Sequence, residues 1–128
     1  MNHRIVPILA ALALTAPVLA ARPAVALNCA EAANTVEMIE CADIDYKKAD
    51  KHLNQSYAAA KKTLDAEGAK LLLDAQRAWI KFRDTNCAVV ADQARGGTLA
   101  PQLAIGCAAG MTETRAKELD EQAKGLGN

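Results

Sequence analysis

The sequence predicts an all-α fold, a small antiparallel bundle of about three helices stabilised by two disulfides. Apolar residues recur at intervals of three and four over two long stretches, which is the spacing of one helix face. Turn-forming glycines separate these stretches and follow the second. Four cysteines all lie after residue 26, and an even number of cysteines in an exported chain indicates disulfides.

Residues 1–26 have the features of a secretory signal peptide. Arg4 is followed by an apolar run, and the tripeptide at 24–26 is a small-x-small cleavage site. The run falls short of the roughly 20 apolar residues of a membrane span, and no later stretch approaches that length. We therefore predict a signal peptide over 1–26 and one helical domain over 27–128, exported to the periplasm or beyond and without a membrane span.

The first helix is predicted from about Thr35 to Leu64. Asn34 with Glu37 three residues later resembles a capping box, and no Pro or Gly interrupts the stretch. A capping Asp65 and Gly68 mark the turn that follows. The predicted buried stripe consists of Ile39, Ala42, Tyr46, Ala49, Leu53, Tyr57, Ala60 and Leu64.

The second helix is predicted from about Ala66 to Arg95, and the short connection predicts that it lies antiparallel beside the first. It contains the only Trp and the only Phe of the chain. The spacing places Leu72, Ala75, Trp79, Phe82 and Val89 on one face, which we expect to be the core. The flanks of that face are then Gln76, Arg77, Lys81, Arg83 and Asp84.

The third helix is predicted from about Pro101 to Lys124. Pro101 suits the first turn of a helix. Gly106 and Gly110 lie inside the stretch, and each costs about 1 kcal/mol against Ala, so we expect a kink or break near Gly110.

Helix geometry favours one of the possible disulfide pairings. Cys87 and Cys107 lie about ten residues on either side of the Gly97-Thr98 turn, so antiparallel helices bring them to one level. Cys29 then pairs with Cys41. Cys41 and Cys87 are also nearly equidistant from the preceding turn, so their pairing remains the alternative.

Several polar residues have both a structural and a binding interpretation. Asp50 is expected to bridge to Arg77 or Arg83, and the Trp79 indole needs a partner such as Asn54 or a backbone carbonyl. Arg115, near Thr112, either pairs between helices or belongs to an exposed recognition surface. The loop Gly96, Gly97, Thr98 and Leu99 is the candidate contact loop, because it lies close to a predicted disulfide; the alternative is a simple connector.

The residue types argue against most catalytic chemistry. His52 is the only His after residue 26 and is expected to be an exposed histidine of a Lys-rich face, and disulfide cysteines are not thiolate nucleophiles. The acidic cluster Glu40, Asp43 and Asp45 is spread around its helix and is interpreted as a solvated turn. We therefore expect no enzyme, no metal and no cofactor. After residue 26 the chain has 13 basic and 15 acidic residues and no basic stripe, which excludes nucleic acid but permits weak attraction to a cationic partner.

Motifs along the whole chain resemble the LprI-like lysozyme inhibitor family of small secreted bacterial proteins. The most specific is AQRAWIKFRDTNC, from Ala75 to Cys87. The others are Cys29, Cys41-Ala42, Ala49-Asp50-x-x-Leu53-Asn54-x-x-Tyr57, Gly96-Gly97-Thr98, Cys107 and Thr112-x-x-Arg115-x-x-x-Leu119.

This resemblance implies a helical, disulfide-bonded protein of the periplasm or cell surface that binds and blocks a lysozyme. The matched positions are interpreted as scaffold, since no inhibitory motif carries over residue by residue. The alternative is an envelope interaction or stress-related module with a different protein partner and no lysozyme inhibition.

Overall fold

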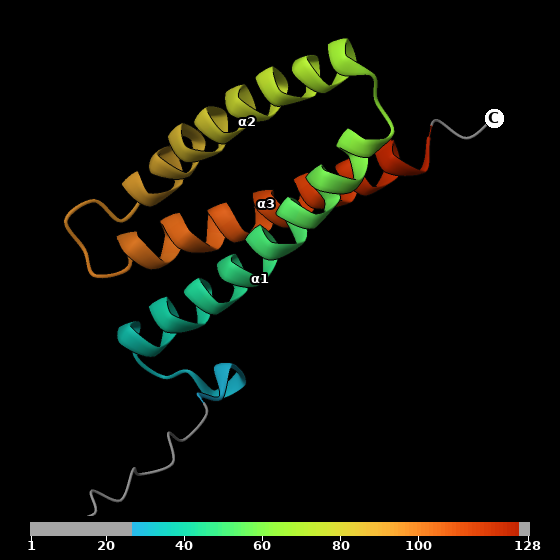
Figure 1. Cartoon of the computed structure of the whole chain (residues 1–128). Helices are drawn as coiled ribbons and strands as arrows, with labels where there is room; N and C mark the ends of the chain where they lie inside the picture. Colours follow the sequence, from blue (N-terminus) through green and yellow to red (C-terminus); the bar gives the residue numbers. More distant parts are fainter. Residues whose placement is uncertain (1–26, 126–128) are drawn as a thin grey trace, which may run out of the picture.

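The computed structural model describes residues 27–125 and consists of three long helices (Figure 1). A short 3-10 helix, η1 (Cys29–Glu31), precedes α1 (Thr35–Lys62), α2 (Ala66–Asp92) and α3 (Ala100–Lys124). The described residues contain no strand. The predicted all-α class is therefore confirmed; the predicted signal peptide lies outside the described residues.

The predicted helix starts are confirmed by their caps. The Asn34 side chain accepts a bond from the Glu37 backbone N–H at 3.0 Å, and the Asp65 carboxylate accepts one from the Gly68 N–H at 2.8 Å. The Glu37 carboxylate in turn accepts from the Ala33 N–H at 2.8 Å. These bonds satisfy N–H groups that the helix itself leaves without partners.

The core lies mainly between α1 and α3, which run parallel to each other (Figure 1). Small side chains dominate this contact, so the two backbones approach closely over most of their length. The largest fully buried side chain is that of Leu119. The buried apolar residues of the pair are Ala42, Ala49, Leu53, Ala60, Ala109, Ala116 and Leu119.

The helix α2 runs antiparallel to both others, but it packs against α3 and hardly contacts α1. The prediction that the first two helices are close neighbours was therefore wrong. The short turn after Lys62 sets only the direction of α2. The small residues of α3 give α1 a closer packing surface than α2 can offer, so α3 lies beside α1 instead (Figure 1).

The buried face of α2 also differs from the predicted one. Ala75 and Phe82 of the predicted core face are exposed, and Val89 is 69% exposed. The residues that α2 buries are Leu72, Gln76, Arg83 and Cys87. Leu72 is buried as predicted and Trp79 packs against the core, so the prediction was right in part. The buried face as a whole is turned by about a quarter of a turn from the predicted one and includes a Gln and an Arg.

The helix α3 continues without interruption from Ala100 to Lys124, so the break predicted near Gly110 was wrong. The helix packs against α1 along most of its length, and this tertiary contact outweighs the intrinsic cost of two glycines.

The two disulfides pair as predicted from helix geometry. Cys29 bonds to Cys41 with a Cα–Cα distance of 5.6 Å, and Cys87 bonds to Cys107 with 5.5 Å. The first bridge holds η1 against the start of α1, and the second holds α2 to α3 near their connecting loop. None of the helices in residues 27–125 combines the length and apolar character that crossing a bilayer requires.

Candidate functional site

Two side-chain hydrogen bonds join the inner face of α2 to α3. Arg83 Nη1 donates to the Thr112 hydroxyl at 3.2 Å, and Arg115 Nε donates to the Gln76 amide oxygen at 3.2 Å. Gln76 and Arg83 lie two helical turns apart and so point the same way. Arg115, Thr112 and the Cys87–Cys107 bridge thus follow one another along the same antiparallel contact. The structure brings together the predicted scaffold residues Gln76, Arg83, Thr112 and Arg115 in this contact.

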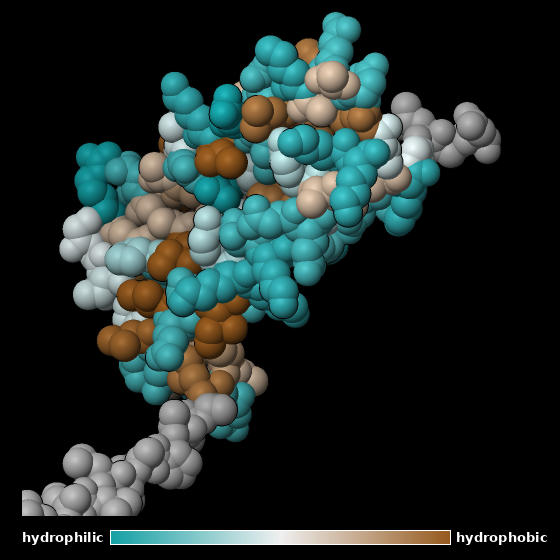
Figure 2. All heavy atoms as spheres, viewed as in Figure 1, coloured by the Kyte–Doolittle hydropathy of each residue, from teal (hydrophilic) through white to brown (hydrophobic). Residues whose placement is uncertain are grey.

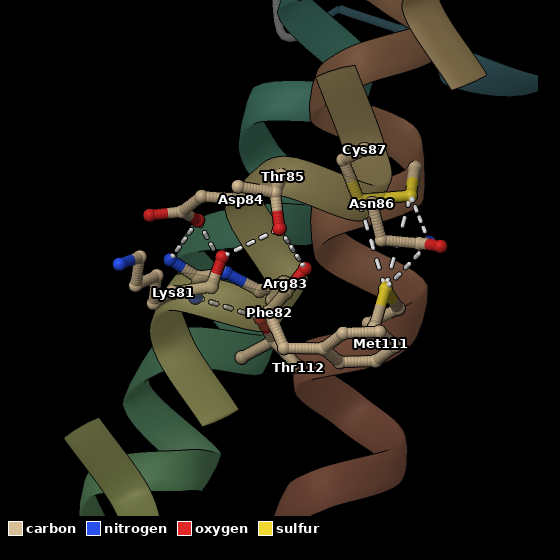
Figure 3. Close-up of polar contacts among 10 residues, drawn as sticks. Lys81, Phe82, Arg83, Asp84, Thr85, Asn86, Cys87, Met111 and Thr112 are labelled. Carbon is tan, nitrogen blue, oxygen red and sulfur yellow. Dashed lines mark hydrogen bonds and ion pairs between the residues drawn. A yellow bond between two sulfur atoms is a disulfide. The ribbon is translucent and has the colours of Figure 1, made fainter. Parts of the chain in front are cut away.

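Arg83 is the residue at which the three helices meet. Its side chain is only 9% exposed, and its guanidinium lies 5.5 Å from the Tyr46 ring centroid and 5.4 Å from the Trp79 ring centroid. Its Nε and Nη2 contact Asp84 Oδ1 at 2.9 and 2.8 Å (Figure 3). Aromatic faces and a carboxylate are the surroundings in which a guanidinium loses water at least cost.

These contacts correct two predictions about the partners of α2. Asp50 does not bridge to Arg83; instead it accepts a bond from the Asn54 amide at 3.0 Å, within α1. Asn54, which with a backbone carbonyl was a predicted partner of the indole, uses only its amide nitrogen for this bond. Trp79 is half-buried beside the core rather than at its centre. Arg77 is exposed on α2.

The second disulfide is covered by Met111 of α3. The Met111 sulfur lies 3.7 Å from the Cys87 sulfur and 3.9 Å from the Cys107 sulfur, and the Asn86 amide points at it from 3.4 Å (Figure 3). The Phe82 ring extends toward Met111 in the same view, yet Phe82 remains 57% exposed. The bridge is thus shielded on this side by a side chain that adapts easily to irregular gaps.

An apolar hollow of about 310 Å³ opens on the other side of this disulfide. Its walls come from all three helices, and the carboxyl group of Asp84 is its one charged group. Both Arg83 contacts use Oδ1 of Asp84, and Figure 3 shows the other carboxylate oxygen directed away from the guanidinium. The hollow is lined by Tyr46, Asp84, Cys87, Ala88, Ala104, Ile105 and Ala108.

The candidate contact loop, Gly96 to Leu99, lies at the same end of the bundle as this hollow. Gly96 has φ +76°, a conformation that glycine adopts without strain, and the loop is exposed throughout. The Gly97 N–H donates to the Ala94 carbonyl at 2.8 Å, so the loop is a hydrogen-bonded turn rather than an open chain. Its role in contact remains a prediction.

His52 joins α1 to α3, which differs from the prediction of an exposed histidine. Its Nδ1 lies 3.0 Å from Glu113 Oε2, and its Nε2 lies 2.8 Å from Asp120 Oδ2. Both carboxylates accept, so both nitrogens donate only when the ring is protonated. The bond to Glu113, followed by that to Asp120, raises the pKa of His52 above its usual value of 6.5.

The sequence contains a signal for only the α3 half of this cluster of His52, Glu113 and Asp120. Glu113 and Asp120 are seven residues apart and therefore lie on one helix face. Their partner is more than sixty positions earlier in the chain, so only the parallel alignment of α1 and α3 reveals it. Within residues 27–125, no group of three or more His, Cys, Asp or Glu residues lies as a metal ion would need.

Comparison with known proteins identifies the family. Residues 28–119 match the family described as lysozyme inhibitor LprI, a range that reaches from η1 to the buried Leu119. An uncharacterized protein of Rhizobium meliloti (strain 1021) is 39% identical over 123 residues, which cover 86% of this chain and 87% of the relative. No solved structure matches the chain. The resemblance drawn from the cysteines and the AQRAWIKFRDTNC block is confirmed, and the chain belongs to the LprI family of lysozyme inhibitors.

Proposed function

We propose that the protein is an exported inhibitor that binds a lysozyme and blocks it by protein–protein contact, without catalysis of its own. The observation that carries this proposal is the family match over residues 28–119, which includes the contact between α2 and α3 and both disulfides. Two disulfides fit an exported protein, because such bridges persist in oxidising compartments.

We assign the contact to the end of the bundle that carries the loop Gly96 to Leu99 and the hollow beside Asp84. The Cys87–Cys107 bridge ties both to α3, so little conformational entropy is lost when a partner binds. Leu99 is 45% exposed at the tip of this end. Protein–protein interfaces commonly have an apolar centre surrounded by polar residues. The exposed Leu99 and the apolar hollow beside its loop can form such a centre.

The hollow favours a long cationic side chain from the partner. Its apolar walls suit the methylene groups of a Lys or Arg, and the free oxygen of Asp84 can accept a bond from the charged end. An enzyme that acts on anionic cell-wall polymers gains from a basic surface, since opposite charge speeds its encounter with the substrate. The chemistry of the hollow therefore matches a basic residue near a lysozyme cleft.

A lysis assay tests this function directly. The oxidised protein, purified from the periplasm, is added in excess to a lysozyme acting on a bacterial suspension, and we expect a dose-dependent slowing of clearing. Lysis that is unaffected by each lysozyme type tested, at high excess, would contradict inhibition. Capture of one reproducible envelope protein in that case would favour the alternative function instead.

Matched variants test the assigned surface. Leu99→Arg and Leu64→Arg place the same charge at two turns of similar exposure, and only the first should weaken inhibition, by about tenfold or more. Asp84→Lys and Asp74→Lys are a second pair of exposed acidic positions on α2. Equal loss within either pair would place the contact elsewhere on the molecule.

A further inference from the structure

The outward face of α2 carries an apolar stripe that no other part of residues 27–125 covers. Leu71 is 63% exposed, Phe82 57% and Val89 69%. Steps of four and three residues place the members on one side of the helix, which is the spacing of a coiled-coil seam. The outer stripe consists of Leu71, Ala75, Ala78, Phe82, Thr85 and Val89.

Apart from Phe82, whose ring also leans toward Met111 of α3, the outer stripe is separate from the face that α2 uses inside the molecule. The inner face buries Leu72, Gln76, Arg83 and Cys87 against α3. The outer stripe lies about one third of a turn away from it. Figure 2 shows apolar residues reaching the surface over α2 among hydrophilic ones. A helix of this length with two such faces has room for a second neighbour.

We propose that this neighbour is a second copy of the chain, bound α2 against α2 in antiparallel orientation. The outer stripe is symmetric about the level of Ile80. In that register Leu71 faces Val89 of the second copy. Ala78 faces Phe82, so that a large side chain meets a small one on each side of the axis. A surface that is complementary to itself is what a two-fold dimer requires.

Charges of both signs lie along one flank of the outer stripe. When Leu71 faces Val89 of the second copy, Lys70 and Asp92 of the second copy lie within two residues of the same level, about 3 Å along the axis. Lys70 already bonds Asp74 within α2 at 2.7 Å, and Asp92 bonds Arg95 of the turn after α2 at 2.6 Å. Lys81 lies near the axis and can turn its flexible ammonium toward water. This mixed flank suits a second copy better than a strongly basic partner.

The size of the contact predicts a reversible dimer. The stripe from Leu71 to Val89 extends over roughly 27 Å at 1.5 Å per residue. A single helix pair of this length lies at the small end of specific interfaces, below about 1,200 Å² in total. We therefore expect association in the micromolar range, with the loop Gly96 to Leu99 and the hollow outside the contact.

Sedimentation velocity of the oxidised protein across a concentration series tests the dimer. We expect the sedimentation coefficient to rise from monomer to dimer between about 1 and 100 μM, in the range where weak interfaces associate. Val89→Asp should shift the midpoint at least tenfold higher. Val36→Asp introduces the same charge at a valine that is 74% exposed on α1, and should leave the midpoint unchanged. A protein that stays monomeric throughout, or equal behaviour of the two variants, would overturn the proposal.

Cysteine crosslinking tests the register. Ala75 faces Thr85 of the second copy. The Ala75 residues of the two copies lie ten residues apart in level, which is about 15 Å along the axis at 1.5 Å per residue. Mixing Ala75→Cys with Thr85→Cys should therefore give a crosslinked dimer, and neither variant alone should. Crosslinking of Ala75→Cys with itself would indicate a parallel pair and contradict the antiparallel one.

The lysis assay separates this inference from the proposed function. Val89→Asp should still inhibit lysozyme as a monomer, because the outer stripe lies outside the assigned contact. If the wild-type protein is monomeric and Val89→Asp abolishes its inhibition of lysozyme, the outer stripe is the lysozyme contact and the dimer proposal is wrong. Failure of inhibition in a protein that does dimerise would contradict the proposed function alone.

Discussion

The contact between α1 and α3 and the contact between α2 and α3 hold the same domain together by different means. Between α1 and α3, small apolar side chains and Leu119 are buried. Between α2 and α3, Arg83, Gln76 and a disulfide make the connection, and Leu72 is the one leucine that α2 adds to the core cluster. The first pair therefore forms most of the core, whereas α2 is attached by one buried leucine and a few specific bonds. An attached helix can expose an apolar face that a core helix would have to bury.

The largest expected effect comes from the apolar contact. Leu119→Ala removes a fully buried side chain from a thin core and should lower the free energy of unfolding by about 3 kcal/mol. Leu64→Ala, at a leucine 43% exposed, should cost well under 1 kcal/mol. Urea unfolding followed by circular dichroism measures both. Similar losses in the two variants would show that the core does not lie between α1 and α3.

Removing the second disulfide should have the next largest effect and should act on α2. Cys87→Ala with Cys107→Ala frees a loop of 20 residues, which costs about 3 kcal/mol in the chain-entropy account. Amide hydrogen exchange should accelerate in α2 more than in α1. The matched double variant of Cys29 and Cys41 should leave exchange in α2 unchanged, since that bridge touches only η1 and α1. Uniform acceleration across all three helices would contradict a separately attached α2.

Arg83 should matter more than its neighbour Arg77, although both belong to one sequence block. Arg83→Ala leaves the buried Thr112 hydroxyl without its donor and removes a side chain packed between two rings, at a cost of about 2 kcal/mol. Arg77→Ala changes an exposed position and should stay within about 0.5 kcal/mol. Thermal unfolding of the two variants compares them. Arg83→Lys should recover only part of the loss, because an ammonium cannot bond Asp84 and Thr112 from one plane.

The features that could be predicted from the sequence are local ones, whereas the side-chain hydrogen bonds that attach α2 to α3 could not be predicted. Caps, turns and cysteine spacing are local signals, so the three helices and both disulfide pairs could be predicted. The apolar pattern of α2 contains two seams, and the pattern alone favours the more apolar one, which includes Phe82 and Val89. The inner seam contains Arg83 and Gln76, whose burial is possible only because Thr112, Arg115 and the Tyr46 ring meet them. Such pairing depends on tertiary structure that no local pattern reports.

The candidate site divides in the same way. The sequence singled out the AQRAWIKFRDTNC block as scaffold, but the hollow beside Asp84 requires wall residues from three helices and could not be read from spacing. The pairing of Asp50 was predicted incorrectly because α2 lies against α3 rather than α1. An error in which helices are neighbours therefore displaces every predicted contact that depends on it.

The smallest expected effect concerns His52, which adds a pH-dependent bond to the core pair of α1 and α3. The bonds to Glu113 and then Asp120 raise the pKa of His52, so its stabilising contribution is fully present below the ordinary value of 6.5 and is lost as the pH rises through the folded-state pKa. The bond to His52 also lowers the pKa of Glu113, so the contribution falls again when acid protonates that carboxyl. Lys117, 3.4 Å from Glu113, remains to pair with it at high pH.

His52→Ala should therefore lower the midpoint of thermal unfolding by a few degrees near pH 5.5 and by less at pH 9, where a smaller fraction of the wild-type rings is protonated. Gln55→Ala, at an exposed neighbour on α1, is the control and should show no such pH dependence. The effect is small because the cluster is about one third exposed and water screens its charges. A loss that is equal at both pH values would mean that His52 contributes by packing alone. Because the cluster links only α1 and α3, hydrogen exchange in α2 should not change with His52, which separates this contact from the one that holds α2.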